Sequence, residues 1–227
     1  YGSITFNQYG KEFPTGGMNE KGLVVELMWL EGTKYPQADK RPAVGVLQWV
    51  QYQLDNSETV EEIIATDKTL RISSAETSVP LHYLVADAKG NVATIEFLDG
   101  KMVVHKGSNL PFPVLTNNTY EESILKTKNA ESGQSFTDNS IERFAKACTM
   151  VKEFQKANTT SSVTDYAFKI LDKVSQGNFT KWSIVYDITN KKILFKSDGY
   201  QAVKSVGFAS FSFNCTDASK MYNINQD

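Results

Sequence analysis

Two carboxamides, Asn117 and Asn118, end an apolar run that contains two prolines, NLPFPVLTNN. The run predicts a buried strand, and a strand end is a rigid place from which to aim a side chain at a cleft. A carboxamide supplies two N–H donors without net charge, which suits the stabilisation of negative charge developing on a carbonyl oxygen. Because asparagine is also a favoured turn residue, an ordinary turn is the alternative.

Arg143 is the second candidate, because it stands in the first turn of a predicted helix. An arginine there opposes the helix dipole. One interpretation is a solvated surface side chain paired with a nearby glutamate. The other is a guanidinium turned inward to hold a thiolate or a carboxylate.

The remaining reactive side chains suggest no base–nucleophile pair. His82 and His105 lie in predicted strands and are interpreted as packed or edge histidines. Cys148 lies on the apolar stripe of a predicted helix, as a core thiol does, and it could pair with Cys215 or stay free. Metal-ligand spacing and phosphate-binding loops are both missing from the sequence, so we expect no metal and no cofactor.

The composition sets the class of protein. The chain has 227 residues, 41% of them hydrophobic, and a formal net charge of -2. These values suit one large globular domain, residues 1–227, and predict binding neither to nucleic acid nor to a membrane. No apolar run approaches the length of a membrane span.

The first half of the chain predicts strands and then helices. Ile4 and Phe6 alternate with polar residues in an opening strand, which Gly16-Gly17 is expected to break. Gly22–Leu30 is apolar on both faces, as in a strand of a sheet covered on both sides. Helices are predicted at Ala43–Leu54 and Val60–Thr66, with a capping box of Thr59 and Glu62 before the second helix.

The second half predicts a hairpin meander, helices and a final group of strands. The expected strands are Leu81–Ala86, Val92–Phe97, Lys101–His105, Trp182–Asp187, Lys192–Lys196 and Val203–Phe213. The expected helices are Ser140–Ala157 and a helix from a Ser162–Asp165 cap to about Ser175. The order indicates an α+β domain with helices packed on sheet faces.

Five blocks of sequence, in order over nearly the whole chain, resemble one enzyme family. They are G-M-N-E-K-G-L at 17–23, S-E-T-V-E-E at 57–62, the hairpin residues Leu81-His82-Tyr83, Ala86-Asp87, Gly90 and Glu96, V-L-T-N-N at 114–118, and S-I-E-R-F at 140–144. The family is that of the choloylglycine hydrolases, which comprises penicillin V acylases and conjugated bile acid hydrolases. Each block alone is weak, and their common order makes the resemblance specific.

The resemblance implies an N-terminal nucleophile (Ntn) hydrolase fold, a four-layer αββα sandwich with antiparallel sheets. Such enzymes cut linear, non-peptide C–N amide bonds with a cysteine that processing exposes as the first residue. Its own α-amino group, with a pKa near neutrality, serves as the base. No cysteine precedes Gly17 in this sequence. We therefore expect the chain to lack an N-terminal segment and, as it stands, to be inactive.

Three residues match site positions of the family. Asn117 matches the oxyanion-hole asparagine, and Arg143 matches the arginine close to the nucleophile. Trp29 stands where the bile acid hydrolases carry an asparagine whose backbone N–H is the second oxyanion donor. A backbone donor survives this change, and tryptophan there resembles the Gram-negative branch of penicillin V acylases. Its side chain is expected to form an aromatic wall for an acyl group, with an ordinary core aromatic as the alternative.

The resemblance also implies a small-molecule acyl amide as the substrate. Other candidate substrates are an N-acyl homoserine lactone or another fatty amide, and the candidate from a different class is an acyl-binding protein without a nucleophile. By resemblance the protein is a homo-oligomer, a tetramer, and its location is periplasmic or secreted, with the cytoplasm as the alternative.

Overall fold

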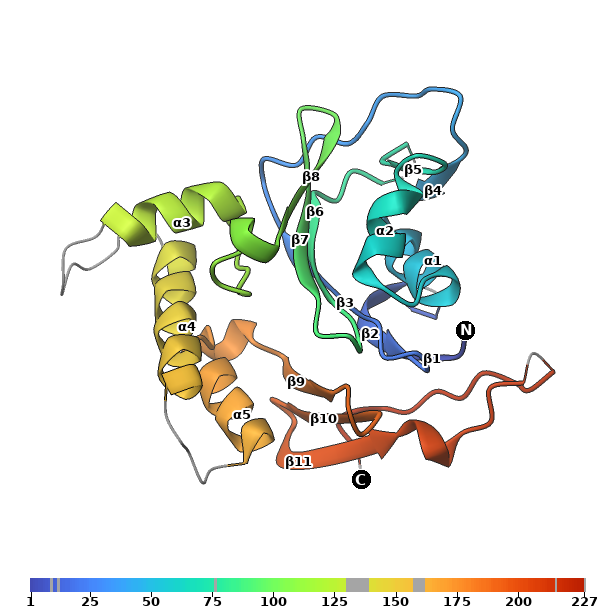
Figure 1. Ribbon diagram of the computed structural model, residues 1–227. Helices are drawn as coiled ribbons and strands as arrows, with labels where there is room; N and C mark the ends of the chain where they lie inside the picture. Colours follow the sequence, from blue (N-terminus) through green and yellow to red (C-terminus); the bar gives the residue numbers. More distant parts are fainter. Residues whose placement is uncertain are drawn as a thin grey trace. The chain divides into compact units, whose positions relative to one another are not determined.

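The computed structural model describes residues 1–8, 10–11, 13–75, 77–129, 139–156, 162–214 and 216–226. These residues form two compact units, 1–144 and 145–227, each with its own antiparallel sheet (Figure 1). The α+β class expected from the sequence is therefore confirmed. This grouping does not test the single domain over residues 1–227, which stays a prediction.

The first unit is built on a six-stranded antiparallel sheet in the order β1-β2-β3-β6-β7-β8. Its strands are β1 (Ser3–Asn7), β2 (Pro14–Asn19), β3 (Val24–Trp29), β6 (Leu81–Ala86), β7 (Val92–Leu98) and β8 (Lys101–Lys106). The predicted meander is confirmed. Its second turn has positive φ at Asp99 and Gly100, 50° and 77°, as a two-residue hairpin loop requires.

The expected strand break at Gly16-Gly17 is wrong, because both glycines lie inside β2. A Cβ on Gly17 would stand 2.7 Å from the carbonyl oxygen of Ile4 on β1, and a Cβ on Gly16 would stand 2.1 Å from Oε1 of Glu26 on β3. The glycines therefore make room for the neighbouring strands instead of ending their own.

Asn19 holds the turn from β2 to β3. Its Nδ2 donates to the carbonyl oxygens of Leu54 and Ser57, both at 2.8 Å. Its Oδ1 accepts from the backbone N–H groups of Lys21 and Leu23, at 3.1 and 3.0 Å. The side chain is fully buried and bonds at both of its ends. It thereby ties the hairpin to the end of a helix 35 residues away.

One layer of helices covers one face of this sheet: η1 (Val46–Gln48), α1 (Trp49–Asn56) and α2 (Val60–Thr66) (Figure 1). The capping box of α2 is confirmed in part, because Thr59 Oγ1 accepts from Glu62 N at 3.3 Å while the Glu62 carboxylate bonds the N–H of Glu58. The helix predicted from Ala43 is wrong in its first turn. Ala43–Gly45 is strand β4, paired in parallel with β5 (Arg71–Ser73).

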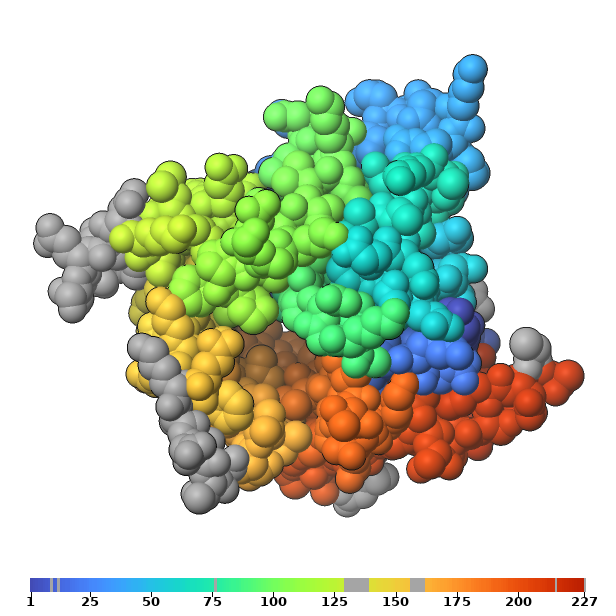
Figure 2. Space-filling model, in the orientation of Figure 1, coloured from blue at the N-terminus to red at the C-terminus, as the bar shows by residue number. Residues whose placement is uncertain are grey.

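The two faces of the β6–β7 hairpin differ in chemistry. Tyr83, Val85, Ile95 and Phe97 belong to the apolar core under α1 and α2. His82, Thr94 and Glu96 alternate with them and so lie on the opposite face. That face is covered by the chain that follows β8, and Figure 2 shows this segment, in green to yellow-green, directly beside the strands. Helix α3 (Tyr120–Asn129) ends the segment.

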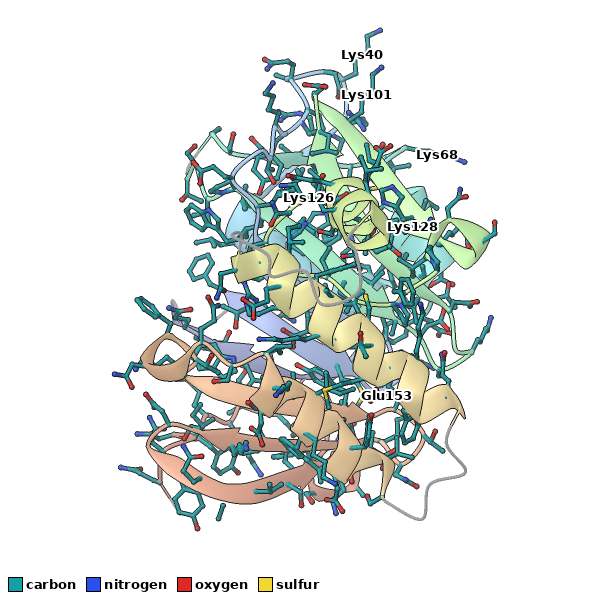
Figure 3. The ribbon with its side chains drawn as sticks, turned by 90° about the vertical axis from the view of Figure 1, so that its left-hand side faces the viewer. Lys40, Lys68, Lys101, Lys126, Lys128 and Glu153 are labelled. Carbon is teal, nitrogen blue, oxygen red and sulfur yellow. The ribbon has the colours of Figure 1, made fainter. Side chains whose placement is uncertain are left out.

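Long charged side chains line the outside of the first unit. Lys40, Lys68 and Lys101, labelled in Figure 3, extend away from the ribbon. On α3, Lys126 Nζ lies 2.7 Å from Glu122 Oε1, one turn earlier. Both side chains of this ion pair are exposed, so the pair contributes little to stability. The inward face of α3 therefore matters more for the fold.

The second unit contains the rest of α4 (Asn139–Lys156), α5 (Val163–Lys173) and a three-stranded sheet in the order β11-β10-β9. Strands β9 (Trp182–Asp187) and β10 (Lys192–Ser197) confirm the predicted hairpin. Helix α4 confirms the long helix, although Ala157 lies outside the described residues. No helix in the described ranges is both long and apolar enough to span a membrane.

Two expectations for this unit are wrong. The Ser162 side chain makes no cap hydrogen bond, because its Oγ bonds Thr164 Oγ1 at 2.7 Å. Strand β11 covers Tyr200–Gly207, so it begins three residues before the predicted start at Val203. A 3-10 turn (Phe208–Ser210) follows it in place of the predicted last residues of the strand. The aromatic residues after Gly207 instead contact one another, as Phe208 and Phe213 do with ring centroids 5.3 Å apart.

Candidate active site

The segment between β8 and α3 is an irregular connection, so the strand predicted for its apolar run is wrong. Pro111 and Pro113 cannot donate to a strand ladder. A side chain takes the place of a strand partner here, because Tyr120 Oη donates to the Phe112 carbonyl at 2.9 Å and accepts from its N–H at 3.2 Å. The buried side chains of Val114 and Leu115 still anchor the run.

Helix α3, which starts at Tyr120, is an element that the sequence reasoning missed. A signal was present in Thr119-Tyr120-Glu121-Glu122, which has the spacing of a capping box. The structure uses it, because Glu122 N donates to Thr119 Oγ1 at 3.3 Å. Asn117 and Asn118 therefore lie in the short connection just before a helix.

Asn117 is held by three hydrogen bonds. Its N–H donates to Ser140 Oγ at 2.8 Å, and its Nδ2 donates to the Trp29 carbonyl at 2.8 Å. Its Oδ1 accepts from Arg143 Nη2 at 2.7 Å. The carbonyl can only accept and the guanidinium can only donate, so these partners fix which end of the carboxamide is which. The structure thus brings all three sequence-predicted site residues together.

Arg143 connects Asn117 to the start of α4. Its Nε donates to Asn139 Oδ1 at 2.9 Å, one turn back on the same helix. The guanidinium therefore bonds the Asn117 carboxamide, whereas the functional interpretation expects it to hold a thiolate or a carboxylate, and its role in catalysis stays a prediction. Because Arg143 uses a nitrogen to hold Oδ1, it turns the donor end of the carboxamide toward β3.

The backbone of Trp29 faces Asn117 for a reason that the sheet register supplies. In an antiparallel strand, each residue points its N–H and its C=O to the same neighbouring strand. The next residue points both groups to the opposite side. Leu30 N donates to Pro80 O at 3.0 Å, so Leu30 uses the β6 side and Trp29 turns to the opposite side. On that side the pairing of β3 with β2 stops at Glu26. Beyond Glu26 this edge of β3 has no strand partner among the described residues, and the N–H of Trp29 lies on it together with the carbonyl that bonds Asn117.

The Trp29 side chain is half exposed, at 50%, and its Nε1 donates to Glu31 Oε2 at 3.0 Å. The alternative of an ordinary core aromatic is therefore wrong. Contact of the indole with an acyl group stays a prediction. One further N–H of Asn117 Nδ2 and the N–H of Trp29 are the donors that this arrangement can offer to a bound oxygen.

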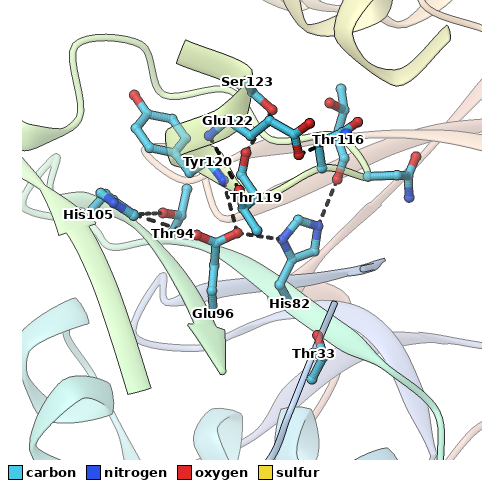
Figure 4. Close-up of polar contacts among 12 residues, drawn as sticks. Thr33, His82, Thr94, Glu96, His105, Thr116, Thr119, Tyr120, Glu122 and Ser123 are labelled. Carbon is cyan, nitrogen blue, oxygen red and sulfur yellow. Dashed lines mark hydrogen bonds and ion pairs between the residues drawn. The ribbon is translucent and has the colours of Figure 1, made fainter. Parts of the chain in front are cut away.

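A buried polar network lies next to these residues (Figure 4). His82, fully buried, places Nδ1 3.1 Å from Glu96 Oε1 and Nε2 2.7 Å from the Thr116 carbonyl. Glu96 Oε1 also accepts from Tyr120 N at 3.0 Å. His82 is thus packed, as expected, but its contacts to the site were missed. The predicted meander contained a signal, because the pairing of Tyr83 with Ile95, continued by one residue, sets His82 opposite Glu96.

The described cysteine is not a nucleophile. Burial raises the pKa of Cys148 to about 12, against a smaller opposing effect of Lys152, so the thiol stays protonated at neutral pH. Cys148 is a free, buried thiol on α4, which is what the sequence predicts for a core residue. Cys215 lies outside the described residues. A thiolate for acyl transfer therefore cannot come from Cys148.

Comparison with known proteins identifies relatives of this chain. Residues 4–130, more than half of the chain, match the linear amide C–N hydrolases of the choloylglycine hydrolase family. The match includes Trp29 and Asn117 but ends before Arg143. A penicillin V acylase of Pectobacterium atrosepticum is 32% identical over 174 residues, which cover 67% of this chain and 45% of that protein. The chain thus spans less than half of the length of this relative.

Solved structures show the same fold. A penicillin V acylase from Agrobacterium tumefaciens superposes with a TM-score of 0.76 at 28% identity, over 92% of this chain and 70% of the other. A variant of conjugated bile acid hydrolase from Clostridium perfringens gives a TM-score of 0.78 at 16% identity, over 97% and 81% of the two chains. These neighbours confirm the Ntn-hydrolase fold.

Proposed function

Because the chain belongs to the choloylglycine hydrolase family of linear amide C–N hydrolases, we propose that the protein hydrolyses small acyl amides with an N-terminal cysteine nucleophile. Tyr1 stands at the first position of this chain and Cys148 is a buried, protonated thiol. Neither of these two residues fits the proposed role of an exposed N-terminal cysteine.

The proposed reaction runs in two halves. The thiolate attacks the amide carbonyl carbon, and the electron pair of the C=O bond moves to oxygen. When the tetrahedral intermediate collapses, the C–N bond breaks and the nitrogen takes the proton that the α-amino group removed from the thiol. Water then attacks the thioester, which releases the carboxylic acid and restores the thiol.

One observation carries the proposal: two partners orient the Asn117 carboxamide, and its second N–H has no acceptor among the described residues. Arg143 Nη2 takes the oxygen at 2.7 Å, and the Trp29 carbonyl takes one N–H at 2.8 Å. The second N–H, together with the N–H of Trp29, forms a pair of neutral donors at one strand edge. Donors fixed before the reaction stabilise developing negative charge without reorganisation.

The test is Asn117→Ala in the mature enzyme, with penicillin V as substrate. Loss of one oxyanion donor is expected to lower kcat about a hundredfold or more with little change in KM. Asn118→Ala is the matched control, because Asn118 is the adjacent carboxamide and its Nδ2 donates to Glu122 at 3.2 Å. A wild-type kcat in Asn117→Ala would refute the assignment.

Substrate class is tested separately. Hydrolysis of penicillin V, glycocholate and an N-acyl homoserine lactone is compared by kcat/KM with one enzyme preparation. Trp29 bonds Asn117 through its carbonyl and has a half-exposed indole, which favours an aromatic acyl group, so the largest value is expected for penicillin V. A larger value for either of the other substrates would contradict this preference.

The candidate from a different class is an acyl-binding protein that lacks a nucleophile. N-terminal sequencing of the native mature protein decides between the two. A cysteine at that terminus supports the amidase. A different residue at that terminus, together with binding of phenoxyacetic acid and no turnover, supports the binding protein.

A further inference from the structure

The peptide unit that leads into Asn117 is fixed at both of its polar atoms. Its oxygen, the Thr116 carbonyl, lies 2.7 Å from His82 Nε2. Its N–H, that of Asn117, donates to Ser140 Oγ at 2.8 Å. The direction of the Asn117 side chain depends on this peptide plane, because the plane sets the position of the next Cα. His82 therefore acts on the carboxamide without touching it.

Glu96 links the two ends of the segment that carries Asn117 (Figure 4). The Glu96 Oε1 atom lies 3.1 Å from His82 Nδ1 and accepts from Tyr120 N at 3.0 Å. One cross-strand pair thus holds the residue before Asn117 and the first residue of α3. Both side chains of the pair are fully buried.

The partners of the pair determine where its hydrogens are. A carbonyl oxygen only accepts, so His82 Nε2 carries a hydrogen toward Thr116. Nδ1 and Oε1 of Glu96 bond only with a second hydrogen between them, on the ring or on the carboxyl group. If that hydrogen left, two acceptors would face each other away from water, which is costly. The geometry is therefore held firmly.

Stability alone does not explain the buried pair of His82 and Glu96. Glu96 Oε2 is buried and makes no hydrogen bond within the described residues, and His105 Nδ1 lies 3.7 Å from it. Buried polar pairs can often be replaced by apolar residues without loss of stability. The opposite face of the same two strands holds such residues, Tyr83 and Ile95. What the polar pair adds is a directed N–H toward Thr116.

We propose that His82 and Glu96 are positioning residues that aim the Asn117 carboxamide through the Thr116 carbonyl and the Tyr120 N–H. The inference rests on the proposed function of Asn117 as an oxyanion donor. It assigns a role to two residues that do not contact the reacting atoms.

The experiment is a double-mutant cycle on the mature enzyme with penicillin V. His82→Asn removes the donor at the Nε2 position, whereas His82→Gln keeps an N–H at about that reach. We expect His82→Asn to lower kcat at least roughly tenfold with little change in KM, and His82→Gln to recover most of the loss. In the Asn117→Ala background, His82→Asn is expected to have no further effect.

Equal losses with and without Asn117 would overturn the inference, because a general structural role does not depend on that side chain. Unchanged kcat in His82→Asn would overturn it too. If Asn117→Ala itself keeps full kcat, the proposed function fails instead. Hydrogen exchange at the Asn117 N–H then decides the inference, which requires faster exchange in His82→Asn than in His82→Gln. If His82→Asn does not fold, Glu96→Gln takes its place in the cycle with the same expected pattern.

Discussion

Asn19 and Asn117 are the same residue type in two regions of one unit. They differ in how many hydrogen bonds their carboxamides already make within the fold. Asn19 is fully buried and bonds four backbone groups. Asn117 is partly exposed, and its side chain bonds one carbonyl and one guanidinium. A carboxamide that has used both donors joins elements of the fold. One that keeps a donor at a strand edge is able to bind a ligand.

The largest expected effect comes from Asn19→Ala. Four backbone groups, three of them buried, would lose their partner, so the free energy of unfolding is expected to fall by about 3–5 kcal/mol. Urea unfolding measures the change, and Asn7→Ala is the control, because the side chain of Asn7 is exposed and, among the described residues, bonds only Thr5. A loss below about 1 kcal/mol would mean that the buried bonds of Asn19 are not what holds the turn.

Asp87 sharpens the comparison as a charged counterpart of Asn19. Burial raises the pKa of its carboxyl group, but hydrogen bonds from Asn91, Val60 and Lys89 outweigh burial and lower the pKa below its ordinary value. A lowered pKa in the folded state stabilises the fold above the unfolded pKa of about 3.9, and this stability is lost as pH falls through the folded pKa.

We therefore expect Asp87→Asn to reduce the free energy of unfolding by about 1–2 kcal/mol at pH 7 and by less at pH 3. Urea unfolding at both pH values tests this. Asn19→Ala is the reference, because a carboxamide does not titrate and its effect should be equal at the two pH values. An Asp87→Asn effect that grows on acidification would contradict the assigned direction of the pKa.

The smallest expected effect on turnover is that of Trp29→Phe. The donor assigned to this position belongs to the backbone, so kcat should stay within a few-fold of wild type while the preference among acyl groups changes. Steady-state kinetics with penicillin V and glycocholate measures both quantities. A hundredfold loss of kcat for both substrates would show that the indole itself takes part in the reaction.

Local signals predicted the elements that depend on nearby residues. The β6–β8 meander follows from its turn residues, and α2 follows from Thr59 and Glu62. Gly16-Gly17 misled, because these glycines are required by Ile4 and Glu26 on neighbouring strands and not by their own turn. Likewise Val44 could not reveal that it pairs with Ile72 in a parallel bridge.

The candidate site was predictable in its members but not in its contacts. Resemblance in the V-L-T-N-N and S-I-E-R-F blocks pointed to Asn117 and Arg143. Their bond, and that of Asn117 to Trp29, join residues 26 and 88 positions apart. Such contacts come from the tertiary fold, for which no local pattern exists. The hairpin register could have paired His82 with Glu96. Their contacts to the Thr116 carbonyl and the Tyr120 N–H show the same limit, because those contacts also come from the tertiary fold.

The free edge of β3 has a consequence for how this protein can diverge. Every amino acid except proline has a backbone N–H. Any substitution at position 29 other than proline therefore keeps this donor. The side chain at this position, and with it the acyl preference that we propose for it, can therefore change while the proposed backbone donor is kept. Position 117 has no such freedom, because the donor that we propose there is the side chain itself.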